Sequence, residues 1–172
     1  MKKYELIEEE KINLYGRTLY RIRACTSFTT INNIEVKEGD LGGFVEKESN
    51  LSHEGRAWVF SNAVVYDDAV VYDDANVYGD ANVYDNAEVY GDAVVYDDAK
   101  VYDDAVVCGN AKVYDDAKVC DNAEVYGDAK VYGDAVVCGN AKVCDNAEVY
   151  DDAKVYDDAK VYDDAKVCGN AK

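Results

Sequence analysis

The chain has little of several residue types, and most of these shortages exclude a class of protein. Its 172 residues include no proline, one tryptophan, one histidine and three phenylalanines, and 18 lysines and arginines face 36 aspartates and glutamates. The net charge of −18 argues against direct binding to nucleic acid or to an anionic membrane surface, because both need a basic face. The longest apolar runs are only a few residues, too short for a helix that spans a bilayer.

The first residues do not have the pattern of a targeting signal. Lys2 and Lys3 are followed by four glutamates before residue 11, whereas a secretory signal needs an apolar segment there. We therefore expect a cytoplasmic protein without a membrane partner. In that compartment the six cysteines are expected to be reduced.

Nearly two-thirds of the chain is one tandem repeat. From Ala63 to Asn170 the sequence reads as 18 uninterrupted hexapeptides. Every copy has Ala first and Val third. The second residue is Val, Asn, Glu or Lys, the fourth Tyr or Cys, the fifth Asp or Gly, and the sixth Asp or Asn. Residues 57–62 form a degenerate copy in the same register.

The chemistry of each position predicts its geometry. Ala and Val stand two residues apart, so in an extended strand they lie on one face. Asp, Asn and Gly tolerate left-handed backbone and form tight turns. Each hexapeptide is therefore expected to be a four-residue strand followed by a two-residue corner, since a period of six drifts around a helix. Three hexapeptides per coil would stack Ala and Val inside a prism, and 18 copies would make six coils.

The pattern aliphatic-x-x-x-small-x, which runs from Val65 to Ala69 and onward, resembles the hexapeptide-repeat left-handed parallel β-helix family over about residues 57–172. This resemblance implies an all-β protein with a three-sided, left-handed parallel β-helix solenoid. The family usually has a small or acidic residue after the aliphatic one, where this chain has Tyr or Cys.

Residues 1–56 are predicted to form a separate, small N-terminal β cap. Residues 12–23 alternate around Gly16 and predict a β-hairpin, residues 34–36 another strand, and residues 39–45 a turn-rich connection. The stretch 39–55 resembles the lead-in of phage and bacterial hexapeptide-repeat proteins of unknown activity. A cap is needed because an open coil end is an edge of unpaired strands.

Many members of the resembled family are acyltransferases that use a histidine general base, often on a loop that leaves the coil. This array contains neither a histidine nor an inserted loop, and His53 precedes it. We therefore predict that the protein is not an enzyme and does not transfer acyl groups from coenzyme A thioesters. A degenerate acyltransferase is the remote alternative.

The repeat offers two candidate kinds of metal ligand. Asp pairs such as Asp67-Asp68 would form carboxylate rows able to hold Ca²⁺, but turn formation and solubility explain them better, and calcium binding stays open. Cys120 and Cys138 are 18 residues apart and hence neighbours in successive coils, yet two thiols do not make a zinc site. The prediction is no metal and no cofactor, with cysteine a tolerated replacement for tyrosine.

Charge is distributed unevenly along the chain. Residues 1–62 carry 9 basic and 10 acidic residues, net −1, whereas residues 63–172 carry 9 lysines and 26 acidic residues, net −17. Residues 63–98 hold ten acidic residues and no lysine. Stacking like charges costs stability, so the frequent choice of Asp over Asn or Gly indicates that the negative field is used. Plain solubility is the competing explanation.

A rigid rod with rows of carboxylates resembles the outline of a nucleic-acid duplex, as in pentapeptide-repeat proteins, whose different β-helix is thought to imitate DNA. The hypothesis is a non-enzymatic solenoid that binds a basic DNA-binding protein, such as a host nuclease or defence protein. The predicted contacts are the lysine-free corners: Asp67, Asp68, Asp73, Asp74, Asp80, Asp85, Asp92, Asp97 and Asp98.

The alternative function is a structural spacer or an end-to-end assembling solenoid. The array runs to Gly169-Asn170 with no recognisable cap after it, and unpaired strand edges are rarely left bare. We therefore expect a two-fold homodimer through the C-terminal coils, because a two-fold contact closes and does not propagate.

Overall fold

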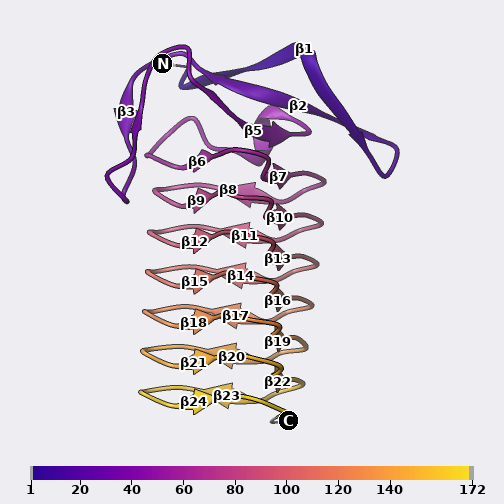
Figure 1. The fold of residues 1–172 in the computed structure, drawn as a ribbon, viewed down its shortest axis with the longest axis vertical. Coiled ribbons are helices and arrows are strands. Elements are labelled where there is room, and N and C mark those ends of the chain that lie inside the picture. Colours follow the sequence, from indigo (N-terminus) through magenta and orange to yellow (C-terminus); the bar gives the residue numbers. More distant parts are fainter. Residues whose placement is uncertain (1, 171–172) are drawn as a thin grey trace.

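The computed structural model describes residues 2–170 and shows a stack of coils beneath N-terminal strands (Figure 1). Each coil adds one strand to each of three parallel sheets. Valines 18 residues apart are paired in register, as Val65 with Val83 and Val83 with Val101. The all-β solenoid is therefore confirmed. The left-handed sense and the three-sided cross-section stay predictions.

The strands of the array are short and regular. The first sheet contains β7 (Val64–Val65), β10 (Asn82–Val83), β13 (Lys100–Val101), β16 (Lys118–Val119), β19 (Val136–Val137) and β22 (Lys154–Val155). The second contains β8 (Val70–Val71), β11 (Glu88–Val89), β14 (Val106–Val107), β17 (Glu124–Val125), β20 (Lys142–Val143) and β23 (Lys160–Val161). The third contains β6 (Trp58–Val59), β9 (Asn76–Val77), β12 (Val94–Val95), β15 (Lys112–Val113), β18 (Lys130–Val131), β21 (Glu148–Val149) and β24 (Lys166–Val167).

These two-residue strands are shorter than the four-residue strands expected, although the hydrogen bonds between coils involve the first four residues of each copy. The Val64 amide donates to the Ala81 carbonyl at 2.9 Å, and the Tyr66 amide donates to that of Val83 at 3.1 Å. The alanines from Ala63 to Ala153 and the third-position valines from Val65 to Val149 are fully buried. The interior is therefore the predicted core of Ala and Val.

The N-terminal region contains the predicted hairpin, formed by β1 (Tyr4–Leu14) and β2 (Arg17–Ala24), and a second one formed by β3 (Phe28–Thr29) and β4 (Glu35–Val36). A single 3-10 turn, η1 (Glu48–Asn50), follows β5 (Leu41–Val45). No helix among residues 2–170 is long and apolar enough to span a bilayer.

The predicted turn-rich connection over residues 39–45 is wrong for all but its first two residues, because residues 41–45 form β5, a strand that joins the cap to the solenoid. It pairs antiparallel with β2 and parallel with β7. A Cβ on Gly42 would lie 2.5 Å from Cγ1 of Ile22, and one on Gly43 would lie 2.5 Å from the Ala63 carbonyl oxygen. These glycines permit close packing on both sides of the strand instead of a turn.

Sheet pairing also runs across the predicted domain boundary after residue 56. Leu51 forms a parallel bridge to Val71, and β5 pairs with β7, so both contacts join residues on opposite sides of that boundary. With β6, which follows the boundary and pairs with β9, these segments make one further coil above the first regular hexapeptide. The backbone of the N-terminal region thus serves as the template on which the array begins.

Candidate partner-binding surface

The corners of the coils position the acidic side chains. The fifth residue of each copy adopts left-handed backbone, with φ of 57° at Asp67, 58° at Asp97 and 72° at Gly79. Only Gly and short polar residues such as Asp visit this region readily. This explains why the fifth position alternates between just these two types.

Several fifth-position aspartates tie successive coils together. The Asp115 carboxylate accepts the Gly133 amide at 3.1 Å, and that of Asp121 accepts the Gly139 amide at 3.0 Å. Asp73 accepts the Gly91 amide at 3.4 Å in the same way. These carboxylates stabilise the stack of corners, so their acidity has a structural use that is independent of any partner.

At the sixth position, asparagine relieves the stacking of like charges. The Asn86 amide donates to Asp104 at 3.0 Å, and Asn146 donates to Asp164 at 3.1 Å. At one of the corners no asparagine separates the carboxylates, because the sixth residue is aspartate in five successive coils. We call these residues the aspartate column: Asp80, Asp98, Asp116, Asp134 and Asp152.

The same corner carries the longest tyrosine stack. Ring centroids are 5.0 Å apart between Tyr78 and Tyr96, 4.8 Å between Tyr96 and Tyr114, and 4.9 Å between Tyr114 and Tyr132. Tyr150 continues the stack at 5.1 Å from Tyr132. Burial against neighbouring rings raises the pKa of Tyr114 to about 12, so its phenol is neutral at physiological pH. In the other two sheets cysteines interrupt the equivalent tyrosines.

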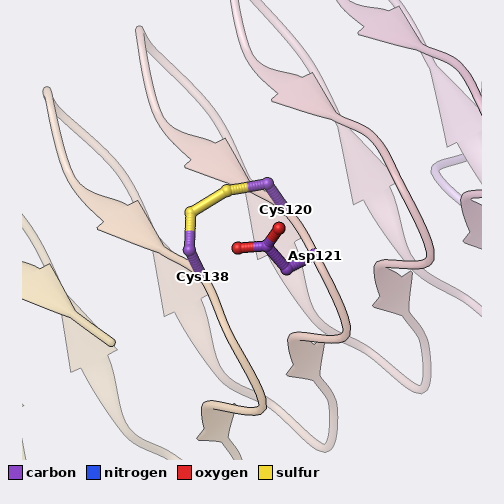
Figure 2. Close-up of side chains that lie close together, drawn as sticks. All are labelled: Cys120, Asp121 and Cys138. Carbon is purple, nitrogen blue, oxygen red and sulfur yellow. A yellow bond between two sulfur atoms is a disulfide. The ribbon is translucent and has the colours of Figure 1, made fainter. Parts of the chain in front are cut away.

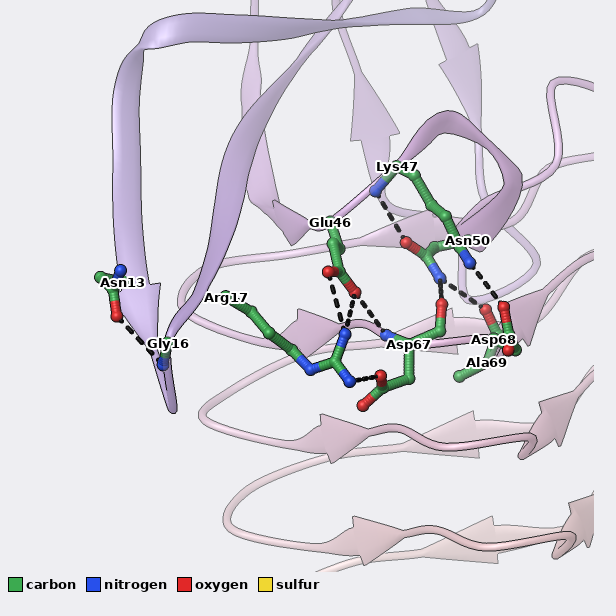
Figure 3. A network of polar contacts seen from close by, with 9 residues as sticks. All are labelled: Asn13, Gly16, Arg17, Glu46, Lys47, Asn50, Asp67, Asp68 and Ala69. Carbon is green, nitrogen blue, oxygen red and sulfur yellow. Dashed lines mark hydrogen bonds and ion pairs between the residues drawn. The ribbon is translucent and has the colours of Figure 1, made fainter.

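The N-terminal region neutralises three of the nine predicted contact residues, and Figure 3 shows two of them, Asp67 and Asp68, with their partners. Arg17 forms an ion pair with Asp67, Lys47 pairs with Asp68 at 2.6 Å, and Arg56 pairs with Asp74 at 2.5 Å. Sequence reasoning missed these pairs because each cation lies 18 or more residues before its carboxylate. These three aspartates anchor the cap.

The six other predicted residues have no basic partner among residues 2–170: Asp73, Asp80, Asp85, Asp92, Asp97 and Asp98. They do not form one cluster, since they occupy all three corners. Asp80, Asp97 and Asp98 share the corner with the aspartate column and the tyrosine stack. Asp92 lines a groove of about 530 Å³ beside the third sheet.

Lysines offset the acidic charge farther along the stack. A groove of about 440 Å³ is lined by four members of the aspartate column, from Asp98 to Asp152, and by Lys100, Lys118 and Lys154. The second-position residue that follows Asp80 is Asn82, so the column begins without an adjacent lysine. The unbalanced negative charge therefore lies in the two coils nearest the cap, over residues 63–98.

His53 packs inside the cap. Its ring stacks on Tyr4 with centroids 4.3 Å apart, and Nδ1 accepts the Lys3 amide at 3.3 Å. Burial is the main cause that lowers the pKa of His53, against a nearby Glu48 that raises it. The histidine thus has a packing role in the structure, and the prediction that the protein transfers no acyl group stays a prediction.

The expectation that all cysteines are reduced is wrong for one pair. A disulfide joins Cys120 and Cys138, whose Cα atoms are 4.7 Å apart (Figure 2). Asp121 lies beside them, and the ligand atoms of the three residues all lie within 4.8 Å of one another. The 18-residue spacing predicted that the two cysteines are neighbours, but it did not predict that the Asp121 carboxylate lies close to both.

Comparisons with known proteins assign no family to this chain. No protein-family model matches it, and no curated protein is similar to it in sequence.

Proposed function

We propose that the protein is a non-enzymatic, acidic β-solenoid that binds a basic, normally DNA-binding protein by imitating the charge of a nucleic-acid duplex. Membership of the left-handed hexapeptide-repeat family and a place in the cytoplasm belong to the same proposal. The observation that carries it is the aspartate column, in which five carboxylates follow one another along a rigid edge. Neighbouring strands are ~4.8 Å apart, so the carboxylates repeat at regular short intervals, as phosphates do.

The surface beside the column suits arginine and lysine side chains. Carboxylates form charge-assisted, often bidentate hydrogen bonds with arginine. The tyrosine rings at the same corner pack face against face, so the carboxylates are the groups that we expect to bind cations. Asp80, Asp97 and Asp98 form no ion pair among the described residues, and we expect them to contribute most.

The test compares two triple variants that remove the same number of charges. One changes Asp80, Asp97 and Asp98 to Asn at the open corner. The other changes three aspartates that already have cationic partners in the cap to Asn: Asp67, Asp68 and Asp74. Each protein is added to purified basic DNA-binding proteins that hold a fluorescent duplex, with heparin as the positive control for displacement by a polyanion.

We expect the wild-type chain to displace the duplex, with a strong dependence on salt. The open-corner variant should displace it roughly tenfold less well, since exposed ion pairs contribute little singly and add up only together. The cap variant should bind nearly as well as the wild type but melt at a lower temperature. Displacement by heparin but not by the solenoid, or equal weakening by both variants, would contradict mimicry and favour a structural spacer.

A further inference from the structure

One pair of cysteines is placed differently from all the others. Five cysteines occupy the fourth position of hexapeptides, but only Cys120 and Cys138 stand in directly successive coils. Tyr126 separates Cys108 from Cys144 in the second sheet, and Cys168 follows Tyr150 in the third. The array therefore contains one place where two sulfur atoms are stacked.

The backbone holds these sulfurs together independently of the disulfide. The Cys120 amide donates to the Val137 carbonyl at 3.0 Å, and the Cys138 amide donates to the Val155 carbonyl at 3.0 Å. The parallel register of β16 and β19 sets the separation. Both residues are buried, with 4% and 8% of their surface exposed. Reduction of the bond would thus leave two thiols facing each other in a fixed geometry.

Asp121 supplies a third ligand from the corner between these strands. Its Oδ2 accepts the Gly139 amide at 3.0 Å, which fixes the carboxylate beside the sulfurs. Figure 2 shows it directed toward the pair.

We propose that, once the disulfide is reduced, Cys120, Cys138 and Asp121 bind one thiophilic divalent metal ion of the zinc class, and that metal binding and disulfide formation exclude each other. Thiolates are soft ligands that select such ions over Ca²⁺ and Mg²⁺. With Zn–S bonds of about 2.3 Å, two thiolates on a tetrahedral ion lie roughly 3.8 Å apart. Cα atoms 4.7 Å apart permit this by side-chain rotation alone. Three protein ligands leave the fourth position to water.

The surroundings favour a cation. The Asp103 carboxylate accepts the Asp121 amide at 3.4 Å from the coil before, and Asp157 follows in the coil after Gly139. Metal binding requires that both thiols lose their protons.

Oxidation of the two thiolates by a peroxide would release the ion. The two thiolates give up two electrons and form the S–S bond. The O–O bond of hydrogen peroxide breaks, and its oxygens take up the two electrons and two protons and leave as two molecules of water. The metal ion, which loses both sulfur ligands, departs into solvent. A thiol reductant reverses the sulfur step.

The experiment uses the full chain, reduced and then freed of reductant without oxygen. Co²⁺ is titrated as a spectroscopic substitute for Zn²⁺, in a large excess of Ca²⁺ and Mg²⁺ that occupies the exposed carboxylates. We expect one equivalent of Co²⁺ to give a thiolate charge-transfer band, Zn²⁺ to displace it, and peroxide to abolish it. Cys120→Ser and Cys138→Ser should lose the band. Asp121→Asn should weaken binding at least by the roughly tenfold that even an outer partner of a ligand contributes.

The double variant Cys108→Ser/Cys144→Ser is the matched control and should bind as the wild type does. A second readout is alkylation followed by mass spectrometry, in which Zn²⁺ should protect Cys120 and Cys138 but not Cys108 or Cys144. Far-UV circular dichroism checks that each variant is folded. Absence of the band, loss of the metal to Ca²⁺, or unchanged binding by folded Cys120→Ser would overturn the proposal.

Discussion

At the cap end of the stack, Ala63 and Val65 are fully buried. At the other end Ala159 and Ala165 are exposed, and 8% of the surface of Val161 is exposed to solvent. The hexapeptides are nearly the same, so the difference comes from the neighbours. The first coils lie under β5 and β6, while a groove of about 370 Å³ lined partly by Ala159 and Val161 opens at the far end of the described residues. A single hexapeptide cannot bury its own Ala and Val side chains, so their burial depends on the coils stacked on either side. Homodimer formation through the far coils stays a prediction, to be tested by sedimentation.

The largest effect should come from a charge placed in the middle of the core. Val113 is fully buried, so Val113→Asp leaves an unpaired carboxylate in an apolar interior and should lower the free energy of unfolding by on the order of 4 kcal/mol or more. Val161→Asp should be clearly milder, because the side chain can reach solvent. Urea denaturation followed by circular dichroism measures both. Equal losses would show that the middle coils are no better shielded from solvent than the far end.

A buried amide at the junction of cap and array should give the next largest effect. Asn50 is fully buried, and its Nδ2 donates to the carbonyls of Asp67 at 3.0 Å and Ala69 at 2.8 Å. Its Oδ1 accepts the Lys47 amide at 2.8 Å. Asn50→Ala removes all three bonds and should cost about 2 kcal/mol or more, because buried polar groups lose their partners.

The matched control is Asn86→Ala, which removes one exposed hydrogen bond to Asp104 within the array. Surface changes of this kind fall within about 0.5 kcal/mol. If both variants melted alike, the junction would contribute no more to stability than any other coil, and its role as a template would be wrong.

The sequence predicted the array well and the junction poorly, for physical reasons. Tandem Ala and Val at a period of six leave only stacking as a way to bury the inner face, so the solenoid and its register follow. Gly42 and Gly43 resembled turn residues because a sequence does not distinguish a glycine needed for a turn from one needed for close packing. The 18-residue spacing of Cys120 and Cys138 predicted that they are neighbours in successive coils.

The acidic surface shows the same limit. Counting charges selected nine aspartates, but it could not show that Arg17, Lys47 and Arg56 fold back onto three of them. Those contacts depend on how the cap sits on the first coils, which no local pattern encodes. The aspartate column, in contrast, can be read directly from the 18-residue period once the coil is known.

The smallest of the three stability effects should be the pH dependence of one cap ion pair. Arg56 donates to Asp74 through its guanidinium at 2.5 Å and its backbone amide at 2.9 Å, and the side-chain bond is the main cause that lowers the pKa of Asp74. A carboxyl whose pKa is lower in the folded state stabilises the fold above its unfolded pKa of about 3.9. That contribution is lost as the pH falls through the folded value.

Arg56→Gln should therefore lower the thermal midpoint slightly at pH 6, and the gap to the wild type should close as the pH approaches 3. Asp67 has the opposite effect on the pH dependence of stability, because its pKa is raised in the folded protein. Burial is the largest cause of that increase and outweighs the nearby Arg17. Protonation of Asp67 in acid thus relieves the fold in both proteins and cancels from the comparison. Arg56→Lys keeps the charge and should retain most of the dependence. A gap that stayed constant from pH 6 to pH 3 would show that Arg56 stabilises the cap by packing its aliphatic stem instead of by pairing with Asp74.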